Sequence, residues 1–144
     1  MKMFFPIFLL VFFVSVFRAE PRYLPPSRLI NALIQVESGG DDNTIGDKKL
    51  KFPAYGCLQI RQPCVRDVND KFKKSFKAKD CLGNRELSIL ICQAYISIWA
   101  KESRLGRVPT PEDMARIWNG GPNGWKRNST RDYWEKVKRE LEKD

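Results

Sequence analysis

The chain has 144 residues and a formal net charge of +9, from 26 Lys and Arg against 17 Asp and Glu, and it contains no histidine. The lack of histidine excludes Ser-His and Cys-His nucleophiles and every metal site that needs an imidazole ligand. Carboxylate chemistry is the catalytic route that is left. The positive charge indicates a polyanionic partner, but the basic residues are scattered and form no nucleic-acid recognition motif, so we expect no nucleic-acid partner.

Residues 1–19 are predicted to be a secretory signal peptide. Lys2 precedes an apolar run at residues 3–17, which has the length of a signal-peptide core and is short for a membrane span. Phe17 fits the small-residue rule for cleavage after Ala19 poorly, so an uncleaved anchor is the alternative. Cleavage removes two cations, Lys2 and Arg18, and no acid, so the formal charge falls from +9 to +7. We expect a secreted, extracellular monomer that does not insert into membranes once the leader is removed.

One domain is predicted at residues 27–144, behind an extended lead-in at residues 20–26. Ser27 is the candidate N-cap of a first helix, and apolar residues recur every three or four positions from Leu29 to Ile34. This spacing is typical of a helix that packs one face on a core. Two glycines, at positions 39 and 40, are expected to end the helix.

Glu37 is the most informative residue of this helix, because it follows Leu33 by four positions and Ile34 by three. It therefore lies on the apolar face, in the last helical turn. Burial and the negative end of the helix dipole both favour its protonated form, and a carboxylic acid that keeps its proton near neutral pH can serve as a general acid. The alternative is a Glu that turns outward into solvent.

The segment at residues 39–56 is rich in Gly, Asp, Asn and Lys, and it predicts turns and short strands. A basic loop is expected at residues 73–83. Four further helices are predicted, at residues 63–72, 85–103 and 111–120 and from about residue 130. The fold class is thus α+β and helix-dominated, with a small β region between the first and second helices.

Four cysteines, Cys57, Cys64, Cys81 and Cys92, fit an oxidising compartment and one or two disulfide bonds. Their spacing matches no zinc pattern, so the sequence predicts no metal site. No organic cofactor is implied either.

Three segments, read together, resemble the lysozyme superfamily. They are ESG at residues 37–39, YGCLQI at 55–60 and RIWNGGPNG at 116–124. The first two resemble the catalytic-Glu and Gly-x-x-Gln motifs of goose-type lysozymes and soluble lytic transglycosylases. The third, with the aromatic residues that follow it, resembles invertebrate-type (destabilase) lysozymes nearly residue for residue. The likeness covers about residues 27–140 and implies a lysozyme-like fold.

The resemblance implies two catalytic residues. Glu37 would be the general acid that protonates the leaving glycosidic oxygen. Asp47 falls where both kinds of relative carry a second carboxylate, although Asp41 and Asp42 are rivals for that role and Asp47 could be an ordinary turn residue.

The resemblance also implies substrate-binding residues within the second and third motifs. The amides of Gln59 and Asn119 would bind the N-acetyl groups and hydroxyls of the sugar. Tyr55 and Trp118 would offer flat faces to sugar rings, and the substrate-binding set is completed by Ile60 and Gly120. Alternatives are open for two of them: Gln59 could bond only to backbone, and Trp118 could belong to the core.

The sequence departs from these families at several positions. Invertebrate-type lysozymes usually have many more cysteines, and they often have histidine where this chain has Trp118. Goose-type enzymes often have an Asp where this chain has Arg61, so a water-positioning pair like theirs is incomplete. Cys57 replaces an apolar or aromatic residue, and it could be a packing residue rather than a disulfide partner.

The resemblance implies a secreted lysozyme that hydrolyses the β-1,4 bond between N-acetylmuramic acid and N-acetylglucosamine. Its partners would be bacterial peptidoglycan and the anionic cell-wall surface, in an antibacterial or digestive role. Two rival functions are a lytic transglycosylase, which gives 1,6-anhydromuramyl products, and an inactive, lectin-like wall-binding protein.

Overall fold

The structure is a computed structural model and describes residues 22–143. The leader predicted at residues 1–19 lies outside the described residues. The elements, in chain order, are α1 (Ser27–Ser38), β1 (Ile45–Gly46), β2 (Ala54–Tyr55), α2 (Gln62–Phe72), η1 (Ala78–Cys81), α3 (Arg85–Trp99), α4 (Glu102–Leu105), α5 (Pro111–Gly120), η2 (Gly124–Lys126), η3 (Asn128–Thr130) and α6 (Arg131–Leu141). None of the helices within residues 22–143 has the length and apolar character that crossing a membrane requires.

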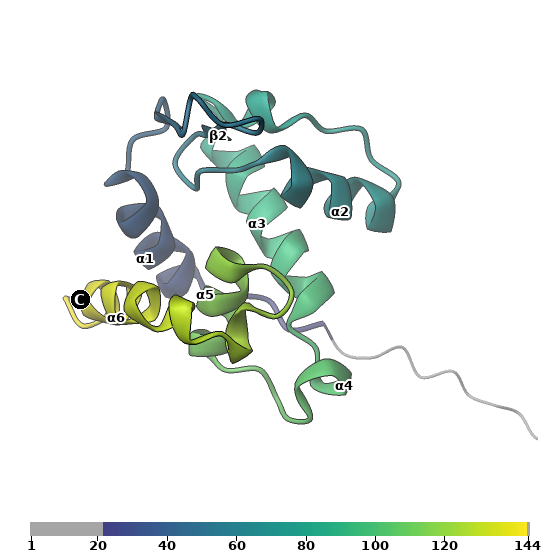
Figure 1. The fold of residues 1–144 in the computed structure, drawn as a ribbon, viewed down its shortest axis with the longest axis vertical. Coiled ribbons are helices and arrows are strands. Elements are labelled where there is room, and N and C mark those ends of the chain that lie inside the picture. The colour runs from purple at the N-terminus through teal and green to yellow at the C-terminus, as the bar shows by residue number, and fades with distance from the viewer. Residues whose placement is uncertain (1–21, 144) are drawn as a thin grey trace, which may run out of the picture.

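Helix α3 is the central element, since it packs against α2 on one side and α5 on the other. Helix α6 lies against both α1 and α5, so the first and last helices of the described chain pack together (Figure 1). The small sheet stands at the end of the molecule, above α1 and α2 in the same view. The helix-dominated α+β fold predicted from the sequence is confirmed.

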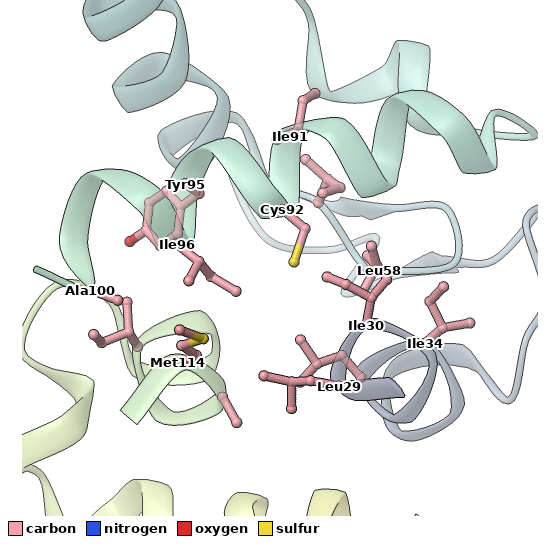
Figure 2. Close-up of a cluster of buried hydrophobic side chains, with 14 of the residues drawn as sticks. Leu29, Ile30, Ile34, Leu58, Ile91, Cys92, Tyr95, Ile96, Ala100 and Met114 are labelled. Carbon is pink, nitrogen blue, oxygen red and sulfur yellow. The ribbon is translucent and has the colours of Figure 1, made fainter. Parts of the chain in front are cut away.

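The core is built from the apolar faces of α1, α3 and α5 and from the turn after β2. The apolar stripe predicted for the first helix is buried as expected: Leu29 and Ile34 each expose only 1% of their surface. Figure 2 shows them in one buried cluster with Leu58 and with Cys92 and Ile96 of α3. Helical periodicity therefore identified the face of α1 that packs inward.

Two predicted helix ends are wrong. Pro26 is the N-cap of α1, not Ser27, because Pro26 is extended and its carbonyl accepts the first helical hydrogen bond, from the amide of Ile30 at 3.1 Å. The helix predicted at residues 85–103 ends at Trp99. There the guanidinium of Arg104 binds the Trp99 carbonyl at 2.7 Å and lies 4.9 Å from the centre of the Trp99 ring. A long-side-chain cap of this kind has no Gly or Pro signal in the sequence.

The β region has the predicted place, between α1 and α2. Strands β1 and β2 pair antiparallel, with Ile45 opposite Tyr55 and Gly46 opposite Ala54. The chain then turns back at once, since the amide of Tyr55 donates to the carbonyl of Ile60 at 2.9 Å and the Ile60 amide returns the same bond. The result is a compact double turn that ends where α2 begins.

The predicted disulfide bonds are not formed: Cys57, Cys64, Cys81 and Cys92 are all free. Three of them are fully buried and belong to the hydrophobic core, where they pack as small apolar side chains. Burial raises the pKa of all four thiols, that of Cys81 to about 11. They are therefore protonated at neutral pH, which weakens them as nucleophiles.

A buried polar network fixes the connection between α5 and α6. The guanidinium of Arg116 donates to Thr130 Oγ1 at 2.9 Å, to Glu112 Oε1 at 2.7 Å and to the Arg127 carbonyl at 2.9 Å. Thr130 Oγ1 donates in turn to the carbonyl of Gly124 at 2.7 Å. Gly124 must be glycine, because a Cβ there would lie 1.9 Å from the Arg116 carbonyl oxygen. This network sets the position from which α6 starts.

We predict that Thr130→Val destabilises the protein by about 1–3 kcal/mol, the usual cost of leaving buried polar partners unsatisfied. Valine keeps the shape of threonine, but it can neither accept from Arg116 nor donate to Gly124. The free energy of unfolding in urea measures the effect. The control is Ser129→Ala, an exposed change in the same 3₁₀ turn, and equal stability of the two variants would contradict the role assigned to the network.

Candidate active site

A cavity of about 300 Å³, here called the cleft, has walls from α1, the β region, α2, α3 and α5. Five of the eight predicted site residues line it: Glu37, Asp47, Gln59, Trp118 and Asn119. The remaining lining residues are Ala54, Arg61, Cys64 and Tyr95. Residues from both halves of the chain therefore meet in one hollow, as the three sequence motifs suggested.

Glu37 stands in the last turn of α1, half-buried at the wall of the cleft. The hydroxyl of Tyr133, in α6, donates a hydrogen bond of 2.7 Å to Glu37 Oε1. The helix ends directly after it, with Gly39 in the left-handed conformation at φ 64°. The hydroxyl of Ser38 donates at 2.8 Å to the carbonyl of Cys57, which fastens the end of α1 to the turn after β2.

The pKa of Glu37 is raised above its ordinary value of 4.5. Burial is the largest cause, because it disfavours the charged carboxylate. Hydrogen bonds from Tyr133 and Trp118 and the positive charge of Arg61 oppose the shift without cancelling it. The group thus keeps its proton to higher pH than an ordinary Glu, which agrees with the general acid predicted from the sequence.

Asp47 has a different environment from Glu37. It follows β1, its φ is 48°, and 53% of its side chain is exposed. The guanidinium of Arg61 forms an ion pair with its carboxylate and also donates to the Phe52 carbonyl at 2.6 Å. Arg61 therefore holds Asp47 at the rim of the cleft while its charge acts on Glu37. The two rival carboxylates, Asp41 and Asp42, do not line this cavity.

The side chain of Gln59 binds backbone of the β region and also borders the cleft. Its Nε2 donates to the carbonyls of Gly56 at 2.9 Å and Thr44 at 3.3 Å, and its φ of 50° closes the tight turn. Gly46 makes room for the amide, since a Cβ there would lie 2.1 Å from Gln59 Oε1. The alternative that Gln59 bonds to backbone is therefore what the structure shows, although the side chain still borders the cleft.

The opposite wall is aromatic. The rings of Trp118 and Tyr95 meet edge to face, with centroids 5.8 Å apart and planes at 82°. Next to them Asn119, in the last turn of α5, is exposed and borders the cleft. This wall therefore places aromatic rings and an exposed side-chain amide side by side.

Three predicted substrate-binding residues do not line the cleft. Ile60 is fully buried in the core. Tyr55 lines a separate groove on the other side of β2, because adjacent residues of a strand point to opposite faces. Gly120 is turned toward Thr130, where a Cβ would approach Thr130 Cγ2 to 2.5 Å. Each of the three was assigned to the site by its place in a motif, but none lines the cleft.

Three residues that touch the site were not predicted for it: Tyr133, Tyr95 and Arg61. Both tyrosines have helical spacing with apolar neighbours, a pattern typical of core positions. A hydroxyl on a core-facing aromatic was the available signal, because a buried tyrosine hydroxyl needs a polar partner. For Tyr133 that partner is Glu37, 96 positions away.

Within residues 22–143, no group of three or more Cys, Asp or Glu side chains is placed to hold a metal ion. The chemistry that the cleft itself offers is proton transfer from Glu37 and the charge of Asp47 and Arg61.

Comparison with solved structures identifies lysozymes of two invertebrates. A Meretrix lusoria lysozyme in complex with PliI of Aeromonas hydrophila has a TM-score of 0.68 and 24% identity, over 80% of this chain and 89% of that chain. An inhibitor-bound Meretrix lusoria lysozyme gives 0.67 and 24%, again over 80% and 89%. Tapes japonica lysozyme gives 0.65 and 25%, over 80% and 92%.

No family model and no curated protein matches the chain. The structural neighbours confirm the predicted resemblance to invertebrate-type lysozymes, and the fold of this chain is the lysozyme fold that they share.

We predict that Tyr133→Phe raises the pKa of Glu37 further, because it removes a hydrogen bond that stabilises the carboxylate. Carbon-13 NMR titration of the Glu37 carboxyl measures the shift. The pKa of Glu37 in the folded protein already lies above its value in the unfolded chain. The free energy of unfolding therefore falls as the pH rises from the unfolded pKa through the folded one. This fall should be larger in Tyr133→Phe.

The matched control is Tyr23→Phe, which removes a tyrosine hydroxyl that donates to Glu102. It should leave the titration of Glu37 unchanged. A Glu37 pKa in Tyr133→Phe equal to or below that of the wild type would contradict the assigned role of Tyr133.

Proposed function

We propose that this protein is a lysozyme, a glycosidase that hydrolyses the β-1,4 bond between N-acetylmuramic acid and N-acetylglucosamine in peptidoglycan. The observation that carries the proposal is Glu37: a carboxyl with a raised pKa, held by Tyr133 at the wall of the cleft. The lysozyme fold of the neighbouring structures supports it.

In the proposed reaction Glu37 gives its proton to the glycosidic oxygen as the bond from that oxygen to the anomeric carbon breaks. The departing sugar leaves as a neutral alcohol, and positive charge builds up on the ring that stays behind. Asp47 borders the same cavity, so it is the carboxylate that would face this charge, as a nucleophile or by positioning water. Division of labour between a buried acid and an exposed carboxylate is expected of such pairs.

The aromatic wall would hold the sugar. Trp118 packs against the apolar face of a ring, while Asn119 donates to and accepts from an N-acetyl group. Gln59 acts indirectly, by fixing the turn that carries Asp47 and Arg61 to the rim. Tyr95 supports Trp118 from behind through the edge-to-face contact.

The proposed setting is extracellular and antibacterial or digestive. The predicted leader at residues 1–19 would direct secretion, and the mature protein would act as a monomer. Its basic surface would draw it to the anionic bacterial wall.

A second candidate, a lytic transglycosylase, is favoured by one observation. Asp47 is exposed and already paired with Arg61, and a transglycosylase needs no second carboxylate. In that reaction Glu37 would act as acid and then as base, and the 6-hydroxyl of the muramyl residue would attack the anomeric carbon in place of water.

Glu37→Gln should keep the fold and reduce clearing of peptidoglycan by roughly 10²–10⁴-fold, because an amide cannot deliver a proton. A turbidity assay on bacterial cell walls measures clearing. Glu135→Gln, an exposed change on α6, is the control and should keep full activity. If Glu37→Gln retains more than a tenth of the activity, the assignment fails. If the wild type binds walls without clearing them, the protein is a lectin-like binder.

Mass spectrometry of the digest separates the two enzyme functions. Reducing muramyl ends are expected from hydrolysis, and 1,6-anhydromuramyl ends from a transglycosylase. Asp47→Asn extends the test, because it should disable the hydrolase and leave a transglycosylase active.

Clearing of walls should weaken as salt is added. Attraction between exposed charges is screened beyond about 10 Å at ~0.1 M ionic strength, and the proposed substrate is a polyanion. Cleavage of a neutral, soluble chito-oligosaccharide is the control and should depend on salt much less. Equal salt sensitivity of both substrates would show that the basic surface does not recruit the wall.

A further inference from the structure

A second hollow, here called the lysine groove, lies on the other side of β2 from the cleft and has a volume of about 290 Å³. Two pairs of adjacent residues separate the hollows. Ala54 lines the cleft and Tyr55 the groove, and Arg61 lines the cleft and Gln62 the groove. Neighbouring Cα atoms are about 3.8 Å apart, so the two hollows are divided by a single layer of backbone.

The charged residues that line the lysine groove are all positive. Three exposed lysines line it, Lys51, Lys77 and Lys79, and no carboxylate does. None of the three ammonium groups takes part in the ion pairs found within residues 22–143. The nearby carboxylate of Asp80 accepts from the backbone amide of Lys77, at 3.2 Å. The three positive charges are therefore available to a ligand.

Between the lysines the groove is apolar. Its lining includes the rings of Phe52 and Tyr55, and the ammonium of Lys51 lies 5.4 Å from the centre of the Phe52 ring. Gln62 is held in place because its Oε1 accepts from the amide of Ala78 at 2.9 Å. Such a surface fits a ligand that alternates carboxylates with small apolar groups, and it suits a neutral sugar chain less well.

We propose that the lysine groove binds the carboxylate-bearing stem peptide of peptidoglycan while the glycan occupies the cleft. This rests on the proposed function. The stem peptide is attached to muramic acid and carries the α-carboxylate of D-glutamate, a C-terminal carboxylate and the methyl groups of alanine. The two hollows share an edge, because Arg61 of the cleft donates to the carbonyl of Phe52, which lines the groove. A peptide attached to a sugar in the cleft would pass over this edge to reach the groove.

The double variant Lys77→Gln and Lys79→Gln tests this on two glycans: intact peptidoglycan, and the same strands after an amidase has removed the peptides. We expect kcat/KM to fall about fivefold to tenfold on the intact substrate, the scale of two lost exposed charge contacts, and to stay unchanged on the stripped strands. Lys136→Gln with Lys138→Gln, an equal charge change on exposed positions of α6, should affect the two substrates alike.

A binding measurement separates this proposal from the proposed function. The N-acetylated peptide L-Ala–γ-D-Glu–L-Lys–D-Ala is titrated into the Glu37→Gln protein and followed by NMR of the Gln62 side-chain amide. Saturable shifts are expected, and they should vanish when both carboxylates of the peptide are amidated. Shifts that persist with the amidated peptide, or equal loss of activity on both glycans, would overturn the proposal. If no glycan is cleaved but the peptide still binds, the proposed function fails and the groove stands.

Discussion

The hydrogen bond from Tyr133 to Glu37 is the contact on which the site depends. It joins the last helix to the first, and it stabilises the carboxylate form of a group whose burial opposes ionisation. Helix α6 reaches Glu37 only because Arg116 and Thr130 fix where it starts and Gly124 lets the backbones approach closely. The acid in the N-terminal part of the described chain is therefore tuned by a network in its C-terminal part.

The β region holds the edge of the cleft, where Asp47 and Arg61 lie, while the contact from α6 holds Glu37. Gln59 uses its amide donors on backbone carbonyls, and Gly46 gives it the space to do so. This rigid turn presents Arg61, which pairs with Asp47 and contributes positive charge near Glu37. One arginine thus acts on both carboxylates, in a chain that has Arg61 where goose-type lysozymes often have an Asp.

Sequence reasoning worked where a local pattern determines the outcome. Helical spacing located α1 and α6, helix-start signals located α2 and α5, and the motif positions Glu37 and Asn119 both line the cleft. Sequence reasoning failed where side-chain contacts that no local pattern encodes decide the structure. The break after Trp99 depends on a cap from Arg104, and Tyr133 becomes part of the site only through α6 packing on α1. Tyr55 and Ile60 were assigned by their place in a motif, but strand alternation and burial direct them away from the cleft.

The positive charge of the chain is unevenly distributed around the cleft, and under the proposed function this bears on how an anionic wall would reach the two carboxylates. The cleft contains Glu37 and Asp47 against a single Arg61, so by itself it does not attract a polyanion. The lysine groove, one backbone layer away, contributes three cations and no acid. Ala54 and Tyr55 are consecutive residues of β2, and they line the cleft and the groove respectively. Under the proposed function, attraction of the wall and proton transfer would thus fall to opposite faces of the same short strand, and the buried acid with its raised pKa would need no cation of its own to attract the substrate.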